Sequence, residues 1–298
     1  MTADRRTVLR SAAQLAALTA AGGLISACGS GAPRRTDPGA LAVHPGNVDP
    51  SHTTDPAWNG GEGPASAPPT APPEPQPTAD PAAATPPPAP PVLPPLAPGT
   101  PAEVVYGPRT GKNVALTFHG SGDPKLATAL LEIAEQHGAK LTVMVVGSWL
   151  DQQPQMARRI LDGGHELGNH TQNHLNISAM TPDQARAEIA QCADRLQKLT
   201  GSIGRWFRPS AAQYATPMVR EQAKAVGYEH VLSFDVDPRD YSDPTAAELQ
   251  RRVLGSVRGG SVVALHMGHQ CTVDALPAIL DGFAKTGLKP VTASQLCA

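Results

Sequence analysis

The chain has 298 residues, of which 40% are hydrophobic, and a net formal charge of −2 at pH 7. This weakly acidic balance excludes a protein that binds nucleic acid through a basic surface. The prolines are unevenly spread, because 22 of the 32 lie between Pro33 and Pro101. About 200 residues after that segment remain for one domain with a sizeable core.

The first residues indicate export. A pair of arginines precedes an apolar run over residues 12–25, which is too short and too rich in Ala and Gly for a good membrane span. The sequence ISAC then resembles a bacterial lipoprotein cleavage box, in which the cysteine is lipidated and becomes the mature N-terminus. We therefore predict a twin-arginine-like export signal over residues 1–27 and a lipid anchor on Cys28, with an uncleaved anchor as the alternative. Cleavage would change the net charge to −4.

Residues 28–101 have the composition of a disordered linker rich in Pro and Ala. The segment has too few large apolar side chains to offset the entropy of ordering. In the polyproline II conformation it would reach at most roughly 200 Å. We therefore expect a tether that carries the following domain, residues 102–298, from the outer face of the cell membrane into the cell wall.

The domain alternates short β-branched runs with helical patterns, which is typical of parallel βα units. A helix is expected over residues 124–137, and further helices are expected to begin after Thr181, Thr216 and Asp243, each of which precedes a proline. Strands are expected at residues 113–119, 140–146, 166–170, 205–208, 230–235, 261–266 and near 290–291. The pattern favours a distorted (β/α)7 barrel, with an open doubly wound sheet as the alternative.

Polar residues occur where these predicted strands end. They are His119, His170, Arg208, Asp235, Asp237 and His266. Because the carboxyl ends of parallel strands share one face, these side chains are expected to form one site.

Three histidines cluster in the segment GHELGNHTQNH. His170 and His174 are four residues apart, so both imidazoles could reach one ion where the strand turns into a loop. Such a pair is an incomplete centre, since catalytic zinc usually has three protein ligands and one open position. His165 precedes the strand, at the opposite end of the barrel, and is interpreted as a surface or structural residue.

These residues resemble the polysaccharide deacetylase family, carbohydrate esterase family 4, which shares the domain of the rhizobial chitooligosaccharide deacetylases. The similarity extends over residues 114–296. HTQNH resembles the metal motif of the family. Phe207-Arg208-Pro209 resembles the motif that lines the groove. The segment DVDPRDY, residues 235–241, resembles the motif whose aspartate orients the arginine, with Tyr241 in place of the usual tryptophan. Ala264-Leu265-His266 resembles the motif of the general-acid histidine.

The resemblance implies a hydrolase that removes N-acetyl groups from a polysaccharide, and with the predicted lipid anchor the substrate would be an extracytoplasmic one such as peptidoglycan or a chitin-like glycan. It implies a divalent metal ion, zinc in the first place, with cobalt or another divalent ion as the alternative. His266 would protonate the departing amine, and Asp237 would hold Arg208, although Asp240 is a second candidate for that role. Substrate contacts are expected from Pro209, Tyr241 and Leu265, and the protein is expected to be a monomer.

The first family motif departs from its usual sequence. The family has Thr-Phe-Asp-Asp-Gly there, with the first aspartate as base and the second as metal ligand, whereas this chain has His119 and Gly120. In our preferred interpretation Asp123 is the third ligand, with His119 as base. Alternatively, His119 completes a three-histidine site and Asp123 is the base. Asp123 could also simply cap the helix that begins at Pro124.

A second hypothesis for the function is a carbohydrate-binding protein that has lost catalysis together with the aspartate pair. Hydrolysis of an O-acetyl group or of another amide is a third. Of the cysteines after the linker, Cys192 is expected to be a buried small side chain. Cys271 and Cys297 both follow predicted strands, so the sequence favours a disulfide between them and two free thiols equally.

Overall fold

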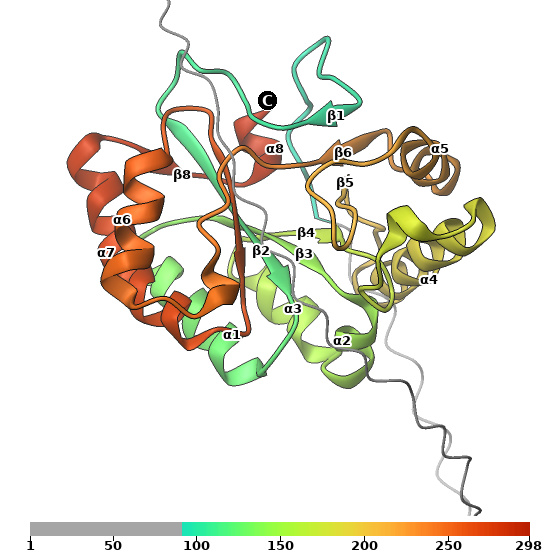
Figure 1. Cartoon of the computed structure of the whole chain (residues 1–298), viewed down its shortest axis with the longest axis horizontal. Coiled ribbons are helices and arrows are strands. Elements are labelled where there is room, and N and C mark those ends of the chain that lie inside the picture. Colours follow the sequence, from blue (N-terminus) through green and yellow to red (C-terminus); the bar gives the residue numbers. More distant parts are fainter. Residues whose placement is uncertain (1–90) are drawn as a thin grey trace, which may run out of the picture. The chain divides into compact units, whose positions relative to one another are not determined.

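The computed structural model describes residues 91–298 (Figure 1). The predicted export signal, the lipidation site Cys28 and most of the predicted linker lie outside the described residues and remain predictions. Within residues 91–298, no helix is both long enough and apolar enough to cross a membrane.

A curved parallel sheet forms the centre of the domain, and its strand order is β1-β6-β5-β4-β3-β2-β7, with β8 pairing with the start of β2. The strands are β1 (Glu103–Val104), β2 (Asn113–Gly120), β3 (Leu141–Val145), β4 (Glu166–Asn169), β5 (Trp206–Phe207), β6 (His230–Leu232), β7 (Val262–His266) and β8 (Lys289–Pro290). From β2 to β6, neighbouring strands follow one another along the chain without the reversal of a doubly wound sheet. The barrel-type fold is therefore confirmed.

The segment after β6 curls the sheet further towards closure. Val236 forms an isolated parallel bridge with Val263 of β7, and its carbonyl accepts a hydrogen bond from the N–H of Ala264. The chain between β6 and η2 (Asp240–Ser242) is thereby laid along β7. This contact brings the loop that carries Asp237 and Asp240 to the end of β7.

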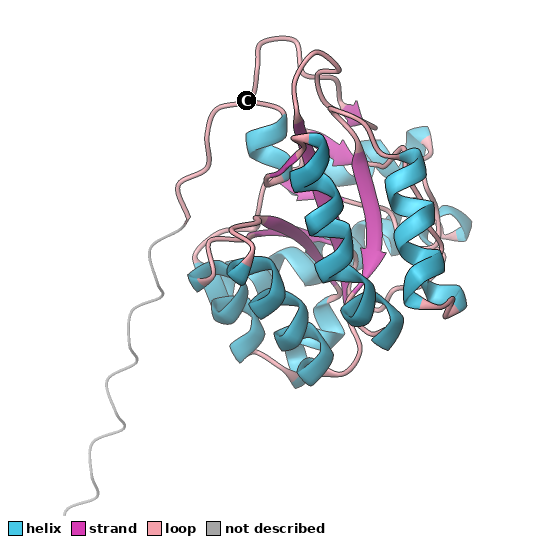
Figure 2. Cartoon of the chain, turned by 90° about the vertical axis from the view of Figure 1, so that its left-hand side faces the viewer, coloured by secondary structure: helices cyan, strands magenta, loops and turns pink. Residues whose placement is uncertain are grey.

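Helices cover the outside of the curved sheet (Figure 2). They are α1 (Pro124–Gln136), α2 (Gly147–Gln152), α3 (Gln155–Asp162), α4 (Pro182–Thr200), α5 (Pro217–Val226), α6 (Ala246–Ser256), α7 (Gln270–Thr286) and α8 (Ala293–Leu296), with the 3-10 helix η1 (Ile177–Ala179). Thr181 and Thr216 cap α4 and α5 as predicted. The prediction for the next helix was wrong, because Thr245 caps α6 and Asp243 lies outside it.

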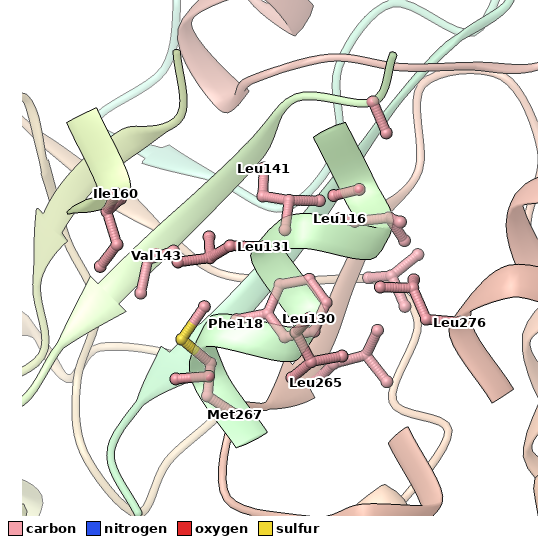
Figure 3. Packing of buried hydrophobic residues seen from close by; sticks show 14 of the residues in the cluster. Leu116, Phe118, Leu130, Leu131, Leu141, Val143, Ile160, Leu265, Met267 and Leu276 are labelled. Atoms are coloured by element: carbon pink, nitrogen blue, oxygen red, sulfur yellow. The ribbon is translucent and has the colours of Figure 1, made fainter. Parts of the chain in front are cut away.

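The pleat of β2 separates the core into two sides. Val114, Leu116 and Phe118 face the helices and belong to the large apolar cluster shown in Figure 3. Ala115 belongs to a second cluster inside the curved sheet. Because side chains alternate along a strand, His119 follows Ala115 and Thr117 on the inner side. The strand is buried on both faces, which explains its nearly continuous apolar sequence.

The chain before the predicted domain boundary already packs on the domain. Arg205 donates a hydrogen bond to the carbonyl of Pro94, and the N–H of Ala97 donates to the carbonyl of Cys297. Leu96 packs against the inner core cluster. Arg205 lies just before β5, so these contacts lie at the amino ends of the strands.

The described cysteines are all free, so the disulfide between Cys271 and Cys297 is absent. Cys271 lies in the first turn of α7, beside the carbonyl of Asp240 at the carboxyl ends of the strands. Cys297 lies after α8 and packs in the inner core cluster. The two thiols therefore lie apart, although each cysteine follows a strand in the sequence. Cys192 is fully buried in α4, as predicted.

His165 is a structural residue, and the alternative of a surface position was wrong. Its ring is buried, and Nδ1 accepts a hydrogen bond from the N–H of Leu141 at 3.1 Å. Nε2 lies 3.4 Å from a carboxylate oxygen of Glu135. This position before β4 is remote from the carboxyl ends of the strands.

Candidate active site

The structure brings four histidines together at the carboxyl ends of the strands. His119 lies near the end of β2, His170 and His174 follow β4, and His266 ends β7. They line a pocket of about 300 Å³. The other lining residues are Pro209, Ala211, Ala212, Gln213, Phe234, Asp237, Tyr241 and Ala264. The prediction that one face of the barrel collects the polar residues of the strand ends is confirmed for His119, His170 and His266. It was wrong for Asp235, whose carboxylate accepts from the N–H of Val262 at the start of β7 and pairs with Arg109 at 2.8 Å.

Asp240 and His266 form a hydrogen-bonded pair beside this pocket. One carboxylate oxygen of Asp240 lies 2.7 Å from Nδ1 of His266, and the other accepts from the backbone N–H of His266, also at 2.7 Å. The hydroxyl of Thr272 donates to the second oxygen at 2.8 Å. Asp240 is fully buried. Since the carboxylate accepts, Nδ1 of His266 carries the proton and Nε2 presents its lone pair.

His119 bridges His266 and Arg208. Its Nδ1 lies 2.8 Å from Nε2 of His266, and its Nε2 lies 3.3 Å from Nη1 of Arg208. A guanidinium only donates hydrogen bonds, so Nε2 of His119 is the acceptor and Nδ1 carries the proton. This arrangement does not favour His119 as the base, because both ring nitrogens are engaged and the nitrogen nearest His266 is already protonated.

Arg208 is fully buried without a carboxylate partner among residues 91–298. Nε donates to the carbonyl of Leu232 at 2.8 Å, and Nη2 donates to the carbonyl of Ser233 at 3.3 Å. Burial lowers the pKa of Arg208 to about 9. The backbone at the end of β6 and just after it therefore holds this guanidinium.

The prediction that Asp237 holds Arg208 was wrong. The carboxylate of Asp237 accepts from the N–H of Arg239 at 2.9 Å and from the hydroxyl of Tyr241 at 3.4 Å, in an exposed loop. Four aspartates fall within nine residues of this loop, at 235, 237, 240 and 243, and the sequence does not show which one turns inward. The partnership of Asp240 with His266 was therefore missed.

Two histidines of the site are held in the neutral form. Burial lowers the pKa of His119 well below its ordinary value, and the neighbouring His170 and Arg208 lower it further. Burial also lowers the pKa of His170, with a further contribution from His174. Neutral imidazoles are the forms that offer lone pairs to a proton or to an ion.

His170 and His174 have the geometry of two converging donors. Nδ1 of His170 lies 3.0 Å from the carbonyl of Arg208, so this nitrogen donates and Nε2 carries the lone pair. Nε2 of His174 lies 3.1 Å from Nε2 of His170. The pair therefore suits two positions around a divalent ion.

A third protein ligand is missing from this arrangement. Among residues 91–298, no three His, Cys, Asp or Glu side chains are arranged to hold a metal ion. The rings of His119 and His170 are stacked at 4.2 Å with their planes 15° apart, so their in-plane lone pairs cannot meet at one ion. The residues present consequently do not fit the three-ligand centre that the family resemblance implies.

Asp123 does not approach the two histidines as a ligand in this structure. Its carboxylate accepts a hydrogen bond from the N–H of Lys125 at 2.8 Å and caps α1, and the residue is exposed. A helix cap is the third of the roles considered for Asp123. Its roles as a ligand or a base stay predictions that would require release of this cap.

Two of the three predicted substrate contacts lie in the pocket, and the third does not. Pro209 and Tyr241 line the pocket, and Ala264 lies there with His266. Leu265 is fully buried in the outer core cluster (Figure 3), so its predicted role as a substrate contact was wrong. Successive residues of a strand face opposite sides, which turns Leu265 away from the pocket.

Backbone strain is concentrated around the pocket. Five described non-glycine residues have positive φ, and all of them lie in loops after β4, β5 and β6. They are Thr171, His174, Ala211, Arg239 and Asp243. Strained backbone of this kind persists where the surrounding structure imposes it, and it commonly gathers at functional sites.

The comparisons with known proteins identify the family of the chain. Residues 106–231 match the family model for polysaccharide deacetylase. The chain is 32% identical over 193 residues to a peptidoglycan-N-acetylglucosamine deacetylase of Bacillus cereus, a match that spans 63% of this chain and 90% of the relative. The chain belongs to the polysaccharide deacetylase family.

Solved structures of polysaccharide deacetylases share the fold. The Bc1960 peptidoglycan N-acetylglucosamine deacetylase superposes with a TM-score of 0.62 at 27% identity, over 65% of this chain and 92% of that one. A family 4 pseudoenzyme of Bacillus anthracis superposes with a TM-score of 0.63 at 25% identity, over 67% and 70%. A mutant of that pseudoenzyme has restored enzymatic activity. Family membership therefore leaves the activity of an individual chain to be decided by its site.

Proposed function

We propose that this polysaccharide deacetylase removes N-acetyl groups from an extracytoplasmic polysaccharide such as peptidoglycan or a chitin-like glycan. The observation that carries the proposal is the buried Asp240, which holds His266 at 2.7 Å beside a pocket in a defined tautomer. A pocket that only binds sugar has no need of a buried carboxylate aimed at an imidazole. The substrate class is supported by the names of the relatives.

His266 is the residue suited to move the proton. With Nδ1–H held by Asp240, its Nε2 takes a proton from the water that attacks the acetyl carbonyl carbon. The carboxylate stabilises the imidazolium that results. The same nitrogen then delivers this proton to the amide nitrogen, the C–N bond breaks, and acetate and a free amine leave.

His119 is suited to donate a hydrogen bond in the same reaction. A substrate that enters between the rings of His119 and His266 replaces the 2.8 Å hydrogen bond between them. The Nδ1–H of His119 is then free to donate to the carbonyl oxygen as negative charge develops on it. Arg208, on the other side of the ring, favours this orientation because it occupies Nε2.

A divalent ion, zinc in the first place, enters the proposal only as an ion that His170 and His174 would bind. Such an ion would polarise a carbonyl and acidify a bound water, and no step above depends on it. The lipid anchor on Cys28, the Pro-rich tether and a monomeric state complete the proposal. They would place the domain on the outer face of the membrane, within reach of the wall.

Acetate release from the whole chain tests the proposal. Peptidoglycan, chitooligosaccharides and an O-acetylated glycan are incubated with the protein, with zinc and with a chelator. His266→Gln should abolish release from the N-acetylated substrates. The matched control is His269→Gln, because His269 makes a 2.7 Å contact with exposed Asp243 and does not line the pocket. Release only from the O-acetylated glycan would redirect the proposal to esters.

A carbohydrate-binding protein is the second candidate, and the replacement of both motif aspartates favours it. Neither His119 nor Gly120 carries a carboxylate, and the Bacillus anthracis pseudoenzyme shares the fold. Retention of glycan by the folded protein, with no acetate released from any substrate, would support this function over hydrolysis.

A further inference from the structure

The end of β2 determines what can happen at position 120, where the family has a metal-binding aspartate. Gly120 pairs with Val145 of β3 in the register of the sheet, and its carbonyl accepts from the N–H of Val146 at 3.1 Å. Because His119 faces the inner side, the pleat turns a side chain at 120 towards the helices. That direction leads away from His170 and His174.

Two valines already fill the space on that side. A Cβ atom added to Gly120 would lie 2.8 Å from Cγ1 of Val143, 3.0 Å from Cγ1 of Val145 and 3.2 Å from its Cα. Both valines are fully buried in the outer core cluster, and Val143 is seen there among Leu131 and Phe118 (Figure 3). Close-packed interiors accommodate such overlap only by moving backbone or neighbouring side chains.

We infer that the third-ligand position of this site is closed by Val143 and Val145, so that the chain binds a divalent ion through His170 and His174 alone. Binding through two imidazoles without a carboxylate is weak and exchangeable, since catalytic zinc usually takes three protein ligands. The inference concerns ion binding and does not rest on the proposed hydrolysis.

Zinc titration of the whole chain by calorimetry tests the inference. The wild type should bind zinc with a Kd of about 1 μM or weaker, and His170→Ala should weaken binding at least about tenfold. Asp123→Ser retains a capping oxygen for α1 and removes the carboxylate. The zinc Kd of Asp123→Ser, and separately that of His119→Ala, should stay within about twofold of the wild-type value, because neither residue is a ligand.

Position 120 is tested with Gly120→Ala and Gly120→Asp. Both variants should lower the unfolding temperature, and neither should tighten zinc binding. Failure of a variant to fold leaves the Asp123→Ser and His119→Ala titrations to decide. The inference is overturned if the wild type binds no zinc, or binds it with a nanomolar Kd. It is also overturned if Asp123→Ser or His119→Ala weakens binding tenfold, or if Gly120→Asp tightens binding tenfold with its unfolding temperature unchanged.

Discussion

His119 and His266 face each other edge to face across two adjacent strands, with Nδ1 of one ring 2.8 Å from Nε2 of the other. The two residues are also register partners between β2 and β7. The pairing of the two strands therefore places the two rings next to each other. Together with Arg208 and Asp240 they form one hydrogen-bonded chain, with a cation at one end and a carboxylate at the other.

The loops after β2 and β7 touch at two glycines, and this contact should hold the two histidines at their distance. Gly122 has φ of +95°, and a Cβ atom there would lie 2.6 Å from Cα of Gly268. Gly122→Ala should lower the free energy of unfolding by well over the roughly 1 kcal/mol expected from positive φ alone. The free energy of unfolding in urea measures this.

The matched control for that substitution is Gly138→Ala, because Gly138 has φ of +66° with open space around its Cβ position. It should show the cost of the backbone angle without the cost of the collision. Equal losses of stability in the two variants would refute a structural role for the close approach of the loops.

Arg252 of α6 stabilises the turn that precedes Asp240. Its guanidinium donates to the carbonyls of Pro238 at 3.1 Å and Arg239 at 3.5 Å, and it pairs with Glu248. Arg252→Ala should lower the free energy of unfolding by about 1–2 kcal/mol and reduce acetate release several-fold. Arg252→Lys should recover part of both, whereas Arg251→Ala, at an exposed position of the same helix, should change neither. Unchanged acetate release in Arg252→Ala would contradict this positioning role.

The stability of the domain should decline in mild acid because of a buried histidine. Burial lowers the pKa of His165 to about 4, and the approach of Glu135 offsets this only partly. In the unfolded chain a histidine titrates near about 6.5, so between these values the unfolded state binds more protons. The contribution of His165 is complete above pH about 6.5 and is lost as the pH falls towards 4, by roughly 3 kcal/mol.

Urea unfolding at pH 7 and pH 4.5 measures this dependence. His165→Asn keeps an acceptor oxygen near the N–H of Leu141 and cannot be protonated. It should lose less stability between the two pH values than the wild type does. His119 and His170 keep part of the slope, because their pKa values are lowered in the same direction. An identical slope in His165→Asn and the wild type would be inconsistent with this assignment.

The sheet could be predicted from sequence because its strands are short apolar runs between clear helix signals. The expected strand over residues 113–119 corresponds to β2, and the proline after Thr181 marks the start of α4. The sequence predicts a start of the helix after β6 at Asp243, because Asp-Pro and Thr-Pro have the same capping pattern, whereas Thr245 caps α6. In the structure Asp243 ends η2 with left-handed backbone, and its carboxylate contacts His269 instead of capping α6, which a local pattern does not report.

The histidines of the site could be predicted because each lies at or just past the end of a strand. The roles of the aspartates could not, since a carboxylate in a loop turns towards whichever donor the fold supplies. Asp240 meets His266 because the segment after β6 is laid along β7 through Val236. Leu265 lies in a family motif but faces the outer core, because neighbouring residues of a motif on a strand point to opposite faces.

The central claim is that the Asp240–His266 pair moves the proton in acetyl hydrolysis, and Asp240→Asn tests it most directly. Asparagine preserves the shape and removes the charge that orients Nδ1–H of His266, so the rate of acetate release should fall about a thousandfold. Asp243→Asn removes a similar 2.7 Å contact, with His269, and should stay within about threefold of the wild type. A folded Asp240→Asn variant that releases acetate at the wild-type rate would contradict the account. A wild-type protein that releases no acetate from any N-acetylated glycan would also contradict it.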